Sequence, residues 1–127
     1  MGNYFQKEIE CASPDQIRAW QSERLVKQVK NIYDNVPYYR TRMQNKGLEP
    51  GDIKSIDDLH KLPFITKDDL RDAYPYGLLA RPLKDCVRMQ STSGTTGRRV
   101  VAFYTQHDLD LWEDCCARAI VAAGGTK

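Results

Sequence analysis

A short stretch rich in hydroxyl groups and glycine holds the residues of this chain best suited to bind a charged ligand. Residues 91–97 read Ser-Thr-Ser-Gly-Thr-Thr-Gly, and two arginines follow directly. Glycine lets the backbone approach a ligand closely, and successive N–H groups together with Ser and Thr hydroxyls can surround an anion. Guanidinium groups match the geometry of phosphate oxygens. The pattern therefore predicts a polyphosphate-binding loop formed by Thr92, Ser93, Gly94, Thr95, Thr96, Gly97 and Arg98.

Two other interpretations of this stretch are a surface hairpin without a ligand and a nucleotide-binding P-loop. A solvent-exposed Ser/Thr/Gly hairpin has the same composition and needs no ligand. The nucleotide-binding P-loop requires G-x-x-x-x-G-K-[ST] followed directly by a helix. No Lys-Ser or Lys-Thr pair follows Gly97, and residues 100–104 form a β-branched and aromatic run typical of a strand. Because residues 86–90 also alternate like a strand, we expect a loop between two strands and not a P-loop.

Helix-start signals divide most of the remaining sequence. Ser13 followed by Pro14 is typical of a helix start, and this helix is expected to end before Pro37. A second short helix then runs to Gly47, and Ser or Thr followed three residues later by Asp predicts helix starts at residues 55, 66 and 105. Helical spacing of apolar residues predicts two buried faces, namely Leu25, Val26, Val29, Ile32, Tyr33 and Val36 in the first helix and Leu109, Trp112, Cys116, Ala119, Ile120 and Ala123 in the last.

The remaining groups that could do chemistry are better explained by structure. Acidic pairs stand at two expected helix starts, where the helix dipole favours them, and no further ligand accompanies Asp57, Asp58, Asp68 and Asp69. His107 lies in the first turn of the last helix without a nucleophile partner, which favours a surface role. The cysteines show no zinc spacing and are expected to be buried, reduced thiols; they are Cys11, Cys86, Cys115 and Cys116. No metal site is predicted.

Composition narrows the class of protein. The chain has 127 residues, 41% hydrophobic and 28% charged, which is typical of a soluble globular domain. A formal net charge of +2, with basic and acidic residues interspersed, does not indicate nucleic-acid binding. No apolar run approaches the roughly 20 residues that span a bilayer, so no membrane association is predicted. The first residues lack the apolar core of a signal peptide, which favours a cytoplasmic location.

Several segments together resemble one enzyme family. Residues 92–97 resemble the phosphate loop of the AMP-forming acyl- and aryl-CoA ligases, the adenylate-forming enzymes. Six further segments resemble the N-terminal signature of the phenylacetate–CoA ligase branch in both order and spacing. They are residues 36–40, 57–63, 66–71, 74–77, 104–105 and 108–110. The chain departs from that branch at Arg98-Arg99, where Lys-Pro is usual, so the charge is kept and the rigid proline is lost.

The resemblance implies an α/β fold. N-terminal helices would occupy residues 13–74 or so, followed by a Gly/Ser/Thr-rich β-hairpin and a helix over residues 86–124 or so. Together, residues 1–127 would form the N-terminal part of the large AMP-binding domain of an adenylate-forming enzyme. The resemblance also implies that the small C-terminal domain, the catalytic lysine and the adenine, acid and CoA sites lie beyond Lys127.

The function implied by the resemblance is an ATP-dependent, AMP-forming aryl-acid–CoA ligase, with phenylacetate as the expected acid. The complete enzyme would use ATP with Mg²⁺ and take CoA as co-substrate, and the chain alone is expected to be inactive. One alternative is an adenylate-forming enzyme with a different acid or acceptor. Another is a stand-alone helical module that binds a protein partner through the spare face of Ile17 and Trp20. A homodimer or self-association of the chain stays open.

Overall fold

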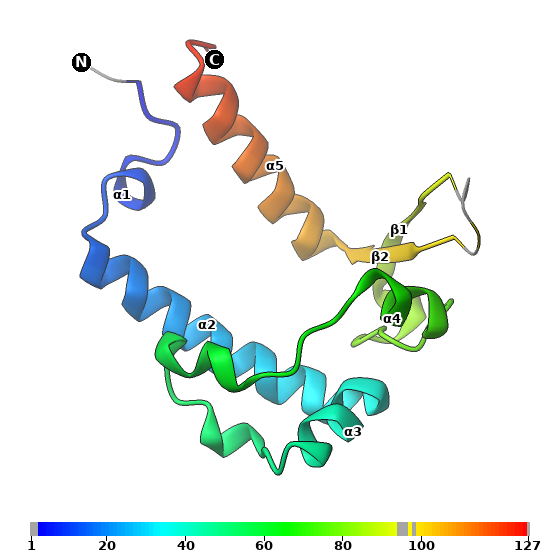
Figure 1. Ribbon diagram of the computed structural model, residues 1–127. Helices are drawn as coiled ribbons and strands as arrows, with labels where there is room; N and C mark the ends of the chain where they lie inside the picture. The colour runs from blue at the N-terminus through cyan, green and yellow to red at the C-terminus, as the bar shows by residue number, and fades with distance from the viewer. Residues whose placement is uncertain (1–2, 94–96, 98, 127) are drawn as a thin grey trace.

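The structure is a computed structural model that describes residues 3–93, 97 and 99–126 (Figure 1). The helices are α1 (Lys7–Glu10), α2 (Pro14–Asn35), α3 (Pro37–Asn45), α4 (Lys67–Asp72) and α5 (Gln106–Ala122). Short 3₁₀ turns lie at Pro50–Asp52, Ile56–Lys61 and Leu83–Asp85. The strands β1 (Cys86–Ser91) and β2 (Val101–Thr105) stand between α4 and α5. The expected order of helices, hairpin and helix is confirmed.

The ends of α2 and α3 follow from local sequence. The Ser13 hydroxyl caps α2 by accepting from the Gln16 N–H at 3.2 Å, and Pro14 occupies the first turn. Helix α3 begins at Pro37, directly after α2. It ends where Gly47 adopts a φ of +67°, with the Leu48 N–H donating to the Met43 carbonyl at 3.0 Å. This positive φ is why glycine stands there.

Three capping boxes fix three further helix starts. In each, a Ser or Thr side chain accepts from a backbone N–H two or three residues on, and an Asp side chain accepts from the backbone N–H of that Ser or Thr in return. The pairs are Ser55 with Asp58, Thr66 with Asp69, and Thr105 with Asp108. The prediction that acidic residues serve helix starts is therefore confirmed for these three carboxylates. The segment after Ser55 forms a 3₁₀ turn instead of an α-helix.

A small core joins α2, α3 and the turn that follows them. Its buried residues are Val29, Val36, Tyr39, Met43 and Ile53, with Leu25, Ile32 and Tyr33 partly buried against them. The expected face of the first helix is confirmed except at Val26, which is 37% exposed. The elements packed on α2 cover only a narrow stripe of this helix, so a residue at the edge of the stripe stays in solvent.

The hairpin is antiparallel and pairs Arg88 with Tyr104 and Ser91 with Val101. A bulge at Val87 shifts the register next to Cys86. The described residues form a sheet of these two strands alone. Helix α5 continues directly from β2, and the Trp112 ring lies 5.6 Å from the Tyr104 ring.

The expected buried face of α5 is largely wrong. Of its stripe, Leu109 is buried, whereas the other five residues are exposed, with Trp112 at 43% and Ile120 at 61%. The cause is visible in Figure 1, where α5 runs away from the other helices, with only the hairpin at its base. No other described element covers this stripe.

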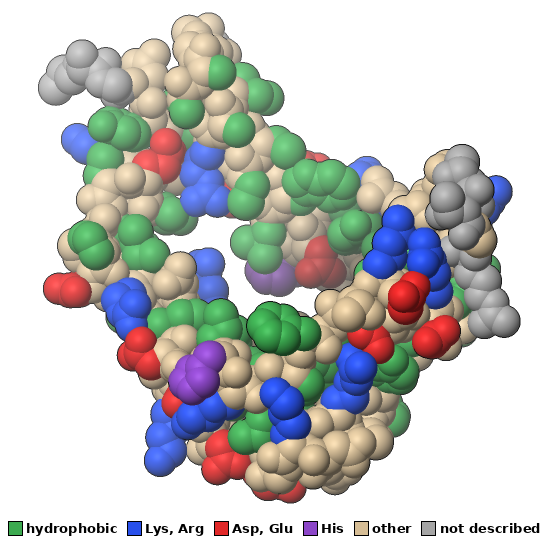
Figure 2. All heavy atoms as spheres, in the orientation of Figure 1, with side chains coloured by type: hydrophobic (Ala, Val, Ile, Leu, Met, Phe, Trp, Pro, Cys, Tyr) green, Lys and Arg blue, Asp and Glu red, His purple; other side chains and the backbone are tan. Residues whose placement is uncertain are grey.

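The molecule has an open shape. In Figure 1, α1 and α2 form one arm and α5 the other, with an open side between them. Figure 2 shows a gap between the arms, with hydrophobic side chains along its rim. Among the described residues, the structure contains no helix that combines the length and the apolarity needed to cross a membrane.

Candidate functional site

The predicted phosphate loop stands at the tip of the hairpin. Thr92, Ser93 and Gly97 are described and exposed, whereas Gly94, Thr95, Thr96 and Arg98 lie outside the described residues. Thr92 closes the mouth of the loop with both its backbone and its side chain. Its N–H donates to the Val100 carbonyl at 3.0 Å, and its hydroxyl accepts from the Val100 N–H at 3.2 Å. The loop is therefore held at its base by a side chain.

Gly97 needs the conformational freedom of glycine. Its φ is +133°, a region that residues with a Cβ rarely adopt. A Cβ added there would meet no atom within 4 Å, so backbone conformation and not space makes this position glycine. An exposed loop with a glycine in this conformation leaves its backbone open to a ligand.

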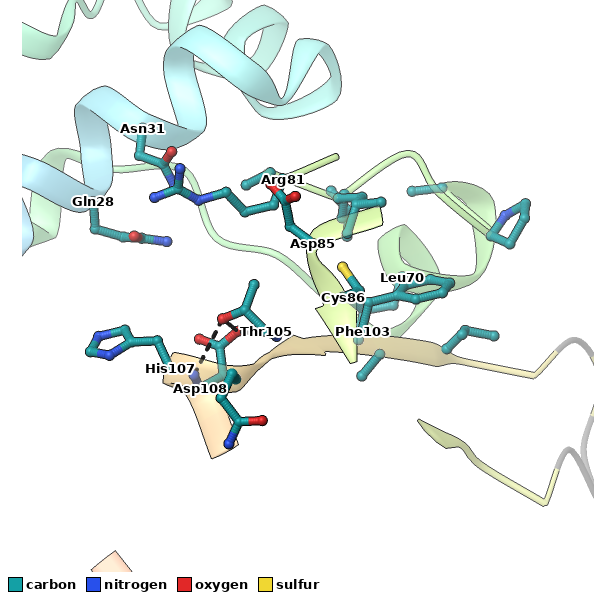
Figure 3. Close-up of a pocket in the computed structure, with 18 residues that line it drawn as sticks. Gln28, Asn31, Leu70, Arg81, Asp85, Cys86, Phe103, Thr105, His107 and Asp108 are labelled. Atoms are coloured by element: carbon teal, nitrogen blue, oxygen red, sulfur yellow. Dashed lines mark hydrogen bonds between the residues drawn. The ribbon is translucent and has the colours of Figure 1, made fainter. Parts of the chain in front are cut away.

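A cleft of about 760 Å³ opens at the base of the hairpin (Figure 3). Its polar lining comes from three parts of the fold. Helix α2 contributes Gln28 and Asn31, the segment before β1 contributes Arg81 and Asp85, and the start of α5 contributes His107 among others. In Figure 3 the Arg81 guanidinium extends toward Asn31. The cleft thus combines amide, carboxylate, imidazole and guanidinium groups.

The charge at one wall of the cleft is fixed by a helix cap. The pKa of Asp108 lies below its ordinary value, first because the Thr105 N–H and hydroxyl donate to it at 2.8 and 2.7 Å. Electrostatic interactions with His107 and Arg81 lower the pKa of Asp108 further. Asp108 therefore stays ionised and committed to its cap, which argues against a proton-transfer role.

The loop and the cleft are separate places. None of the described loop residues lines the cleft, although β2 connects the two through Val101, Ala102 and Phe103. Sequence reasoning missed Gln28, Asn31, Arg81 and Asp85, and set His107 aside as a surface residue. These residues come from segments far apart in the sequence, and no local spacing pattern carries that information.

A second polar cluster joins α3 to α4. Asp69 is only 7% exposed and accepts hydrogen bonds from the Thr66 N–H at 2.6 Å and the Tyr38 hydroxyl at 2.7 Å. Arg42 pairs with it at 3.0 Å. These contacts hold the pKa of Asp69 far below its ordinary value, chiefly through the Thr66 backbone, and Asp69 in turn raises the pKa of Tyr38. Because Thr66, Tyr38 and Arg42 supply these partners of Asp69, we interpret the cluster as a structural joint that holds α3 against α4.

The cysteines do not behave as buried thiols. All four are free, but Cys11, Cys115 and Cys116 are exposed and Cys86 is half-buried. The expected burial is therefore wrong, because α5 lacks a covering element over the side that carries two of them. Among the described residues, no group of three or more His, Cys, Asp or Glu side chains could hold a metal ion.

The chain is similar to curated enzymes over most of its length. It is 49% identical over 119 residues to a phenylacetate-coenzyme A ligase of Pseudomonas putida, covering 94% of this chain and 27% of the relative. It is 45% identical over 118 residues to the enzyme of that name from Escherichia coli (strain K12), covering 93% of this chain and 27% of that relative. The chain is therefore similar to one part of the phenylacetate-coenzyme A ligases. It spans about a quarter of their length, as expected for one portion of such an enzyme.

Solved structures agree on the fold. A crystal structure of 2-hydroxyisobutyryl-CoA ligase, in complex with 2-HIB-AMP and CoA, matches 93% of this chain with a TM-score of 0.83 at 24% identity. The match covers 26% of that chain. The expected α/β fold of an adenylate-forming CoA ligase, represented here by part of it, is therefore confirmed. No protein-family model matches the chain.

Proposed function

We propose that this chain is the phosphate-loop portion of an ATP-dependent, AMP-forming aryl-acid–CoA ligase, and that phenylacetate is the acid. The observation that carries the proposal is 40–49% identity to four phenylacetate-coenzyme A ligases over 92–94% of the chain. The open glycine at Gly97 and the exposed hydroxyls of Thr92 and Ser93 support a polyphosphate ligand at the hairpin tip. Gly94, Thr95, Thr96 and Arg98 belong to the proposed site by sequence.

In the proposed reaction the acid carboxylate attacks the α-phosphorus of ATP, and the bond to pyrophosphate breaks. The CoA thiol then attacks the acyl carbonyl and AMP leaves. The hairpin loop would bind the β- and γ-phosphates, so that pyrophosphate departs from an oriented position. Its contribution would come from positioning and from neutralising the charge that develops on the leaving group.

Mg²⁺ would accompany ATP in this reaction and neutralise phosphate charge. The described loop residues offer hydroxyls and no carboxylate, and the described part of the chain has no cluster of three metal-binding side chains. Mg²⁺ is commonly held by substrate phosphates and water with one or two protein ligands. The hydroxyls of Thr92 and Ser93 fit a minor share of such a shell, with the remaining ligands supplied by ATP.

A chimaera provides the test of this function. In it, the chain replaces the matching 119-residue segment of the Pseudomonas putida relative. We expect the chimaera to exchange pyrophosphate into ATP when phenylacetate is present, and to form phenylacetyl-CoA when CoA is added. A folded chimaera that exchanges no pyrophosphate with phenylacetate or other aryl acids would contradict the proposal.

Gly97→Val in the chimaera tests the loop itself. A β-branched residue at a φ of +133° is strained, and such strain costs about 1–3 kcal/mol or displaces the backbone. If the transition state bears this cost, the adenylation rate falls roughly 5- to 150-fold. Formation of thioester from preformed acyl-adenylate should change little, because no pyrophosphate leaves in that step. Gly51→Val is the matched control, since Gly51 has equally open surroundings and no positive φ. Equal losses in both half-reactions would show that the loop serves only the fold.

A further inference from the structure

We draw no further inference here: the strongest candidate, the cleft at the base of the hairpin between α2 and the start of α5, carries none, because its lining sets the Arg81 guanidinium beside the carboxylates of Asp85 and Asp108 and so selects no class of ligand, and nothing in the structure shows what fills it.

Discussion

The side chain of Thr92 takes the place of a backbone group at the mouth of the hairpin. Beyond Ser91 and Val101 the strand ladder stops, yet the Val100 N–H still finds an acceptor in the Thr92 hydroxyl at 3.2 Å. A hydroxyl can accept and donate at once, so the same group keeps a proton for a ligand oxygen. Thr92 can thus close the loop and contact phosphate, two roles that substitutions should separate.

Thr92→Val removes the acceptor of the Val100 N–H, while Thr92→Ser keeps it. A hydrogen bond of this kind contributes about 0.5–1.5 kcal/mol net, so we expect the Val100 amide hydrogen to exchange roughly two- to tenfold faster in Thr92→Val. Thr92→Ser should exchange at nearly the parent rate. NMR-detected hydrogen exchange measures both. Equal exchange rates in the two variants would mean that the side chain does not hold the loop.

At the scale of the element, short-range signals in the sequence predicted helix starts well. Ser13, Thr66 and Thr105 cap helices because the groups they satisfy lie within three residues along the chain. What the sequence could not give is contact between distant segments. The Tyr38 hydroxyl meets Asp69 across 31 positions, and Arg81 reaches the cleft beside Asn31 of α2. Such meetings depend on packing directions that no local pattern encodes.

The joint between α3 and α4 should make the chain sensitive to acid. Asp69 has a pKa below its ordinary value in the folded chain, and Asp58 has one of about 2, chiefly because of Lys61. In the unfolded chain, Asp has its ordinary pKa of about 3.9. Between the folded-state pKa values and about 3.9, the unfolded chain therefore binds more protons than the folded chain. The stability that these two ionised carboxylates contribute is fully present above the unfolded-state pKa. It is lost as the pH falls toward their folded-state pKa values. We expect the loss to run from about pH 5 to pH 2.

Asp69→Asn should lower the free energy of unfolding at pH 7 and flatten its loss in acid, because the group that takes up the proton is gone. The difference between Asp69→Asn and the parent should narrow as the pH falls. Asp68→Asn is the control, since Asp68 is an exposed first-turn neighbour in the same helix, where it forms an ion pair with Arg71. Urea unfolding followed by circular dichroism at several pH values supplies the comparison. If the free energy of unfolding fell equally steeply with decreasing pH in Asp69→Asn and in the parent, the acid sensitivity would come from groups other than Asp69.

At the scale of the whole molecule, the sequence predicted correctly that the hairpin and the last helix form, and it predicted wrongly that the face of that helix is buried. Both results have one cause. Period and capping define an amphipathic helix, but burial needs a second surface over the whole face. Trp112 stays 43% exposed although its ring contacts that of Tyr104, and Ile120 stays 61% exposed. The two-stranded hairpin is likewise marginal without further strands. The uncovered face of α5 and the two-stranded hairpin together account for the open shape seen in Figure 1.

The open shape leads to the prediction that the chain alone forms no thioester. The described residues of its proposed phosphate loop, Thr92, Ser93 and Gly97, are exposed to water, where charged contacts are weakened by solvent. Adenylation also requires ATP and the acid to be held together with water excluded, and the 760 Å³ cleft that could enclose a ligand is not lined by the described loop residues. With ATP, phenylacetate and CoA, we therefore expect AMP release from the purified chain at the level of a blank. The chimaera serves as the positive control in the same assay, and AMP release by the isolated chain that Gly97→Val abolishes would show that these 127 residues hold a complete active site.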